Sequence, residues 1–270
     1  DETVLDGEGA RRVLSLTGAS SGAENIMIAR ARTSSTTKSG TEIGFGLNMV
    51  NAGIVDNCIV SNAVTTGSVE GSIETWVYVN GGIITNSVIC NGTLVNVGRS
   101  IVLAKGVIGS TKIYGNVSQH KNGGVVTVLG ANSYLVDCDI YSNRDQMREY
   151  GVCCGTVSAR SSAKILNCRI FNNTAVFNRS GTYLGIGINA ASAHNTGGLN
   201  VANNLSYANV IIDKCVVSNN TMQSPGVGLS GSYFKNGCAA LGVLLGYKTT
   251  LKNSLIVNNT ITPHKGYYFE

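Results

Sequence analysis

The chain has 270 residues, a formal net charge of +5, 43% hydrophobic residues and only 13% charged residues. The hydrophobic share excludes a disordered chain, and no run of about 18 apolar residues offers a membrane span. The mild, scattered basic charge argues against a nucleic-acid partner. With 34 Gly and 2 Pro, few charges and many Asn, Ser and Thr, the composition is typical of a β-rich protein with many turns.

One pattern recurs seven times along the chain. It consists of an apolar residue, an Asn-like residue, a Cys, Ser or Thr, a second apolar residue and a closing Asn. The copies span residues 55–62, 84–91, 108–116, 135–143, 165–173, 212–220 and 251–259. The intervals between their central residues are 29, 24, 27, 30, 47 and 39 residues. Near-regular intervals with a few long ones predict a solenoid in which some coils carry long loops.

A second apolar segment separates successive copies, and two similar segments precede the first copy. The separating segments are residues 75–79, 100–103, 125–129, 184–188 and 241–245, and the early ones are 13–16 and 25–28. We therefore expect each coil to contain the strand of the repeat and one further apolar strand.

The repeat predicts which side chains face the inside of the solenoid. We number its positions from the central Cys, Ser or Thr, which is position 0. Alternation along a strand sends positions −3, 0 and +2 inward and positions −2, +1 and +3 outward. Stacking lines up like residues about 4.8 Å apart. The Asn residues at positions +4 and +5 are expected to form a hydrogen-bonded ladder at a turn, where left-handed backbone is tolerated.

Residues 167–173, with the sequence Asn-Cys-Arg-Ile-Phe-Asn-Asn, show the repeat most clearly. The pattern, which covers residues 1 to about 260, resembles the right-handed parallel β-helix repeat family of pectate-lyase-like proteins and bacterial surface proteins. The resemblance implies an all-β chain folded as a single-stranded right-handed parallel β-helix of about 8–10 coils. We expect a single domain, residues 1–270, with long loop insertions near 174–209 and 221–249.

The eight cysteines are interpreted mainly as core residues. Position 0 of the repeat holds Cys58, Cys138, Cys168 and Cys215. At this inward position they are expected to be buried free thiols rather than a disulfide framework. Cys90 falls at outward position +3 and is expected to be the most exposed thiol. The cysteine spacing fits no zinc site, so no metal site is predicted.

Three successive copies place charges and aromatic rings on the outward face. Position +1 carries Lys112, Asp139 and Arg169, and position +3 carries Tyr114, Tyr141 and Phe171. Such a strip suits an extended sugar chain, because rings offer stacking surface while charges bind carboxylates and hydroxyls. We expect a secreted or cell-surface module that binds a polysaccharide or cell-surface glycan, or displays a surface that faces one, without cleaving it.

Three other interpretations stay open. The resemblance implies a polysaccharide lyase or another carbohydrate-active enzyme that acts on an extended glycan. In a lyase, Lys112 or Arg169 would abstract a proton from a uronate, with Asp139 as a metal ligand or partner and Ca²⁺ as the one candidate cofactor. The same residues also fit a plain surface ion-pair ladder beside an aromatic stack that covers the sheet. Alternatively, the chain is a segment of a phage tailspike or autotransporter passenger, present as a homo-oligomer or within a longer parent chain.

Overall fold

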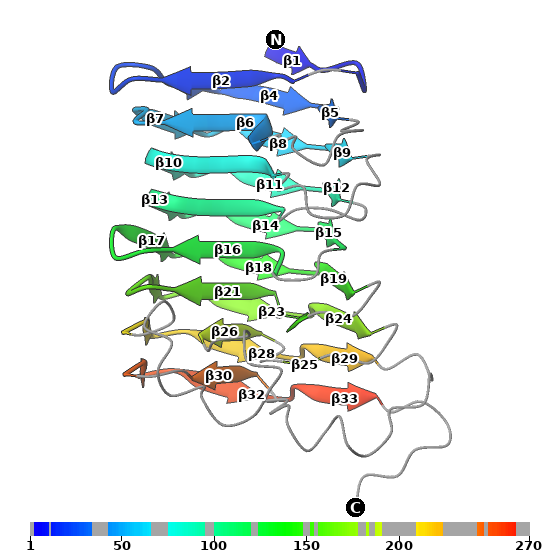
Figure 1. Cartoon of the computed structure of the whole chain (residues 1–270), viewed down its shortest axis with the longest axis vertical. Coiled ribbons are helices and arrows are strands. Elements are labelled where there is room, and N and C mark those ends of the chain that lie inside the picture. The colour runs from blue at the N-terminus through cyan, green and yellow to red at the C-terminus, as the bar shows by residue number, and fades with distance from the viewer. Residues whose placement is uncertain are drawn as a thin grey trace, which may run out of the picture.

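The computed structural model describes residues 3–10, 12–33, 43–65, 75–94, 100–119, 124–147, 152–153, 156–177, 182–183, 187–190, 209–223, 242–245 and 248–262. These residues wind through nine stacked coils, one for each strand of the sheet that runs from β1 (Thr3–Asp6) to β32 (Leu255–Val257) (Figure 1). Strands of neighbouring coils pair in parallel, so the protein is a parallel β-helix. The expected fold class and the expected number of coils are confirmed.

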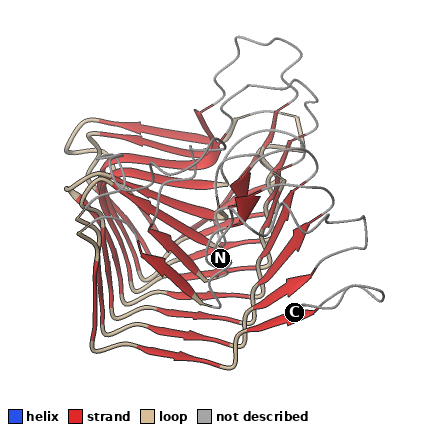
Figure 2. Cartoon of the chain, turned by 60° about the horizontal axis from the view of Figure 1, so that its bottom comes forward, coloured by secondary structure: helices blue, strands red, loops and turns tan. Residues whose placement is uncertain are grey.

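Three long sheets form the walls of the solenoid (Figure 2), and β20 (Val152–Cys153) and β25 (Thr182–Tyr183) form a short fourth sheet. Sheet A contains β1, β4 (Ile26–Ala29), β8 (Ile59–Ser61), β11 (Val88–Cys90), β14 (Lys112–Tyr114), β18 (Asp139–Tyr141), β23 (Arg169–Phe171), β28 (Val216–Ser218) and β32. Sheet B contains β2 (Leu14–Thr17), β3 (Ala23–Glu24), β6 (Ile43–Val50), β7 (Ile54–Asp56), β10 (Thr75–Thr85), β13 (Ile101–Gly109), β16 (Val126–Leu129), β17 (Ser133–Val136), β21 (Val157–Arg160), β22 (Lys164–Leu166), β26 (Ile188–Ala190), β27 (Ile211–Asp213), β30 (Val243–Leu245) and β31 (Thr250–Lys252). Sheet C contains β5 (Arg32–Thr33), β9 (Val64–Thr65), β12 (Thr93–Leu94), β15 (Val117–Ser118), β19 (Arg144–Met147), β24 (Thr174–Phe177), β29 (Thr221–Gln223) and β33 (Thr260–Thr262).

Two residues with left-handed backbone turn the chain in every copy of the repeat. At position −1 they are Asn57, Asn86, Ser110, Asp137, Asn167, Lys214 and Asn253, and at position +4 they are Asn62, Asn91, Gly115, Ser142, Asn172, Asn219 and Asn258. Their φ angles lie between 46° and 64°, a region that Asn, Asp and Gly tolerate better than β-branched residues do. The Asn-rich part of the repeat therefore marks the two ends of each sheet A strand.

Positions −3, 0 and +2 face the interior, as expected. The clearest column is position +2, where each side chain from the second coil to the eighth is at most 1% exposed. The column consists of Ile28, Val60, Ile89, Ile113, Ile140, Ile170 and Val217. Full burial of one such side chain is worth about 1.5–3 kcal/mol, so the aliphatic ladder is a main source of stability.

A ladder of inward-facing Asn side chains at position +5 joins the later coils. Its members are Asn116, Asn143, Asn173, Asn220 and Asn259. Each of the first four donates its backbone N–H and its side-chain Nδ2 to the Oδ1 atom of the next Asn, at 2.8–3.0 Å. The expected ladder is thus present at position +5, whereas position +4 supplies the left-handed corner residue.

Each coil contains more strands than the sequence predicts. The repeat bends at position −1, so its first half lies in sheet B and its second half in sheet A, as in β17 and β18. Sheet C is a third wall of strands that are only two to four residues long, as in β15 and β24. Such short strands carry too few alternating residues to show as a periodic pattern.

The two expected loop insertions contain parts of the solenoid itself. Residues 174–209 include β24 and β26, and residues 221–249 include β29 and β30. Most other residues of these two ranges lie outside the described residues. In the described part of the chain, no helix is long and apolar enough to cross a membrane.

Candidate functional site

The six residues expected to bind or process a sugar lie together on the outward face of sheet A. One row consists of Lys112, Asp139 and Arg169, and the other of Tyr114, Tyr141 and Phe171. Within each row the residues are direct partners across β14, β18 and β23. We call the six residues the strip. The alignment of these residues predicted from the repeat is confirmed. It could be predicted because position 0 and the corner at position −1 fix which residues of each strand face outward.

Arg169 and Asp139 form an ion pair within the charged row. Nε of Arg169 donates to Oδ1 of Asp139 at 2.6 Å, and Nη2 donates to Oδ2. This hydrogen bonding to the carboxylate raises the pKa of the Arg169 guanidinium. The Arg169 side chain is 62% exposed, so solvent screens the pair, and pairs of this kind contribute at most about 1 kcal/mol. Lys112 is also exposed, and it forms no ion pair with another described residue.

The aromatic row is a continuous stack. The ring centroids of Tyr114 and Tyr141 are 5.1 Å apart with 17° between the ring planes, and those of Tyr141 and Phe171 are 5.1 Å apart with 11°. The guanidinium carbon of Arg169 lies 5.8 Å from the centroid of the Phe171 ring. Both faces of the Tyr141 ring are therefore covered by its neighbours. Ring edges, phenolic hydroxyls and the outer faces of the two end rings are the parts that a ligand can reach.

The aromatic row ends at Cys90, which pairs with Tyr114 across β11 and β14. Among the described cysteines Cys90 has the largest exposed fraction, as expected, but at 4% it is buried like the other four. Burial raises the pKa of the Cys90 thiol, and a hydrogen bond with Cys90 raises the pKa of the Tyr114 hydroxyl. The same outward position is also buried in the two preceding coils, where Ala29 and Ser61 are 6% and 3% exposed, so the pattern of a single strand does not establish exposure.

The position 0 cysteines form a buried thiol ladder, as expected. Cys138, Cys168 and Cys215 each point Sγ at a backbone carbonyl of the preceding coil, at 3.4–3.5 Å. Hydrogen bonding with its two thiol neighbours and burial raise the pKa of Cys168 well above its usual value. These three cysteines, Cys58 and Cys90 are free, whereas the side chains of Cys153, Cys154 and Cys238 lie outside the described residues.

A hollow of about 310 Å³ lies on the outward side of the early coils, beside the same sheet. It is lined by Asn25, Ile26, Asn57, Cys58, Ile59, Asn86 and Val88. Asn57 Nδ2 donates to Oδ1 of Asn25 at 2.6 Å. Ile59 and Val88 stand at position +1, the position that Lys112 occupies in the next coil, so the hollow lies next to the strip. From the sequence, Asn57 and Asn86 are expected only to form turns. The repeat gives no sign that they line a surface hollow.

No three His, Cys, Asp or Glu side chains among the described residues are grouped so that they could hold a metal ion. The chain matches no protein-family model, no curated protein and no solved structure at a significant level. The assignment of the fold therefore rests on the repeat in the sequence and on the strand register, and the site rests on its own geometry.

Proposed function

We propose that this chain is a secreted or cell-surface β-helix module that binds an extended acidic polysaccharide along the outward face of sheet A without cleaving it. The observation that carries this proposal is the strip, in which exposed Lys112 and Arg169 side chains stand beside three stacked aromatic rings. A guanidinium and an ammonium group bind carboxylates or sulfates through charge-assisted hydrogen bonds. The ring edges and tyrosine hydroxyls next to them supply contacts for the sugar units.

The hollow extends this surface toward the N-terminal coils. Its amide side chains, such as Asn25 and Asn57, can exchange hydrogen bonds with sugar hydroxyls, and Ile59 and Val88 offer an apolar floor for the ring carbons. Since neighbouring coils are spaced by about 4.8 Å, the hollow and the strip together form an elongated track along the solenoid axis. An elongated track favours a polymer over a small ligand.

Two features favour binding over eliminative cleavage. Lys112, the candidate base, is exposed to solvent, whereas lysines that act as bases are usually activated by burial or by a neighbouring cation. Arg169 lies two coils from Lys112, about 10 Å along the axis. Asp139 lies between them and accepts two hydrogen bonds from the Arg169 guanidinium. A polysaccharide lyase acting through Lys112 or Arg169, with Ca²⁺ as its cofactor, remains the alternative that the experiment must separate from binding.

The test is a binding titration with defined acidic polysaccharides, a polyuronate and a sulfated glucan, and with a neutral glucan of matched length. We expect binding to the acidic polymers that weakens with salt. Because charge-assisted hydrogen bonds are worth about 1.5–3 kcal/mol, Arg169→Ala should weaken the binding about tenfold or more. Lys112→Ala should also weaken it.

Lys252→Ala is the matched control. Lys252 is 54% exposed and pairs with Asp213 at 3.4 Å, so this substitution removes an equally exposed ion pair from sheet B and should leave binding unchanged. Equal losses in Lys252→Ala and Arg169→Ala would mean that only overall charge matters and would refute the proposed track. A rise in ultraviolet absorbance from unsaturated uronate ends during incubation, with or without Ca²⁺, would establish a lyase instead.

A further inference from the structure

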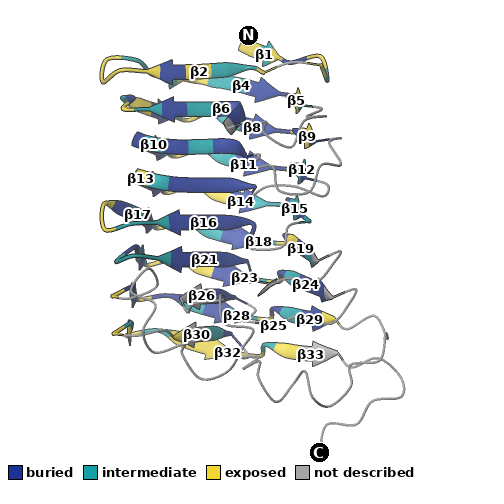
Figure 3. Ribbon diagram, in the orientation of Figure 1, coloured by how far each residue is buried: buried dark blue, intermediate teal, exposed yellow. Residues whose placement is uncertain are grey.

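The outward charges of the strip change sign from one coil to the next. Lys112, Asp139 and Arg169 stand at position +1 of three successive coils and are direct partners across β14, β18 and β23. In each of these strands the outward residues are exposed or half-buried and the inward residue between them is buried (Figure 3). The middle coil has a second exposed carboxylate, Asp137 at the corner position −1, where the two flanking coils have uncharged residues. On this face the middle coil is therefore acidic, and the coils on either side of it are basic.

The two cations of the strip are separated by two coils. Neighbouring coils are about 4.8 Å apart, so Lys112 and Arg169 start about 10 Å apart along the axis. One sugar unit of an extended polysaccharide chain spans about the same distance as one coil. A chain that lies along the axis therefore places its first and third units beside the two cations and its second unit beside Asp139.

The middle coil offers no cation on sheet A to an acidic group of that second unit. An acidic group turned toward the charged row meets the carboxylate of Asp139, which accepts from Nε of Arg169 at 2.6 Å. An acidic group turned toward the aromatic row meets Tyr141, which is stacked between two rings. The first orientation brings like charges together, and the second desolvates a charge without a counter-charge, so both are unfavourable. An uncharged sugar can instead donate a hydroxyl or amide hydrogen bond to Asp139.

We infer that the strip selects a polysaccharide in which acidic and uncharged sugar units alternate over a polysaccharide in which every unit is acidic. The inference rests on the proposed function, because it names the class of polymer that the same site takes. The segment recognised has three units, with acidic groups at Lys112 and Arg169 and an uncharged unit at Asp139. Position +1 of the coils on either side of the strip holds Val88 and Val216, so the selection is confined to these three coils.

Overall charge favours the opposite order of affinities. The chain has a net charge of +5, and a polymer with an acid on every unit carries more charge per unit length than an alternating polymer. Nonspecific attraction would therefore bind the fully acidic polymer more tightly. A preference for the alternating polymer can come only from the arrangement of charges along the strip.

The test compares two unsulfated polymers with the same number of sugar units by isothermal titration calorimetry. One alternates glucuronate with N-acetylglucosamine, and the other is a polyglucuronate. We expect wild type to bind the alternating polymer about fivefold more tightly, the effect of one solvent-exposed contact between like charges. Asp139→Asn removes that contact, so it should raise the affinity for polyglucuronate more than the affinity for the alternating polymer and abolish the preference.

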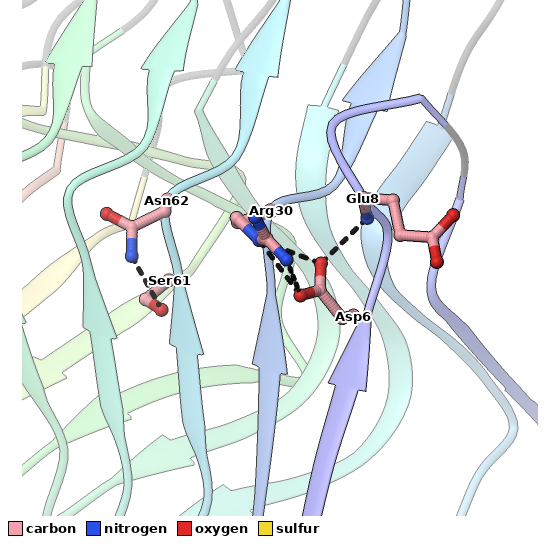
Figure 4. A network of polar contacts seen from close by, with 5 residues as sticks. All are labelled: Asp6, Glu8, Arg30, Ser61 and Asn62. Atoms are coloured by element: carbon pink, nitrogen blue, oxygen red, sulfur yellow. Dashed lines mark hydrogen bonds and ion pairs between the residues drawn. The ribbon is translucent and has the colours of Figure 1, made fainter.

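Asp6→Asn is the matched control. Asp6 accepts hydrogen bonds from Arg30 of the next coil, as Asp139 does from Arg169 (Figure 4). The two carboxylate side chains are similarly exposed, 28% for Asp6 and 23% for Asp139. Asp6 lies on β1, five strands from β18 in sheet A, so its substitution changes the net charge equally but away from the strip. The preference for the alternating polymer should stay as in wild type.

The outcomes separate this inference from the proposed function. If neither acidic polymer binds, the proposed function is refuted, and this inference with it. If both bind but wild type binds polyglucuronate as tightly as the alternating polymer or more tightly, this inference alone is overturned. A preference that persists in Asp139→Asn, or that disappears equally in Asp6→Asn, would also overturn it, because the charge of Asp139 would then not be its cause.

Discussion

The indole ring of Trp76 occupies the space in which a side chain on residue 92 would stand. A Cβ atom on Gly92 would lie 2.6 Å from Cε2 and Cζ2 of the fully buried indole. Gly92 stands at position +5, and its backbone N–H donates to Oδ1 of Asn116 at 3.0 Å. The Asn ladder therefore begins one coil after Gly92, because the indole fills the interior where an earlier Asn side chain would lie.

Gly92→Ala should destabilise the protein by about 1–3 kcal/mol, the usual cost of overpacking a core. Trp76 is the only tryptophan, so the unfolding midpoint in urea can be followed by its fluorescence. Gly109→Ala is the control, because the atom nearest to a Cβ there is 3.6 Å away. Equal midpoints for Gly92→Ala and the wild type would show that the indole can move aside without cost.

Asn173→Ala should cost about 2–5 kcal/mol, because it orphans several buried hydrogen-bonding groups at once. Asn173 accepts from the backbone N–H and Nδ2 of Asn143, and it donates to Ile140 and Asn220. The neighbouring Asn172 is an exposed residue with φ of 54°. Asn172→Ala should cost only about 1–2 kcal/mol, the strain of left-handed backbone. Free energies of unfolding from urea titrations distinguish the two, and a larger loss at position 172 would contradict the ladder's role.

Within the strip, Tyr141→Ala should lower stability more than Arg169→Ala does. Tyr141 loses stacking contacts with two rings, and each is worth about 0.5–1.5 kcal/mol beyond the buried area. Arg169 loses an exposed ion pair worth at most about 1 kcal/mol. Chemical denaturation of both variants measures the difference. A larger loss of stability in Arg169→Ala would contradict this prediction. It would mean that the ion pair between Arg169 and Asp139 holds the coils together, so that a ligand could not displace Asp139 from Arg169 without a cost in stability.

The five described free thiols should resist alkylation in the folded protein at mildly alkaline pH. Burial keeps the reagent from all five, because each is at most 4% exposed. Alkylation also needs the thiolate, and burial raises the pKa of Cys58 and Cys90, while thiol neighbours and burial raise that of Cys168. A hydrogen bond with Cys168 lowers the pKa of Cys215, so the resistance of Cys215 depends on its burial. Peptide mass spectrometry after iodoacetamide treatment, with and without urea, gives the modified fraction at each site. Rapid labelling of Cys90 without urea would show that this thiol is accessible in the folded protein and would contradict its burial.

Asp6 should stabilise the folded state at neutral pH and lose this effect in acid. The hydrogen bonds from Arg30 and from the Glu8 backbone lower the pKa of Asp6 in the folded protein. A carboxyl group whose pKa is lower when folded stabilises above its unfolded pKa, about 3.9, and loses that contribution as the pH falls through the folded value. Unfolding of wild type and Asp6→Asn should therefore differ at pH 7 and converge toward pH 2. A difference that is the same at both pH values would mean that the charge of Asp6 has no part in it.

The interior of the solenoid could be predicted from the sequence because its signal is repeated. Inward positions such as Ile140 and Ile170 recur with the same neighbours in seven copies, so chance matches are averaged out. The strand β6 was missed because two glycines interrupt its apolar pattern, and β21 was missed because Ser158 and Ala159 weaken it. Propensity alone does not identify such strands, which are formed by pairing with the coils on either side.

For the strip, the repeat predicts which residues face outward but not how their side chains contact one another. Its register followed from counting residues, so Lys112 and Arg169 were placed correctly on the outward face. The covered faces of Tyr141 depend on how the rings stack across neighbouring strands, and Cys90 is buried although the repeat places it at an outward position. The spacing of residues within one repeat does not say how side chains of neighbouring coils pack against each other, so both features became visible only in the structure.

The Asn ladder also makes the two halves of the solenoid mechanically unequal. The hydrogen bonds between coils run along the axis, so a force that separates the end coils acts on every coil junction with the same tension. The junctions after Asn116 each hold additional buried amide bonds, whereas the earlier coils have Ala31, Ala63 and Gly92 at that position. Under load the coils before Asn116 should peel apart first, while the later coils remain intact.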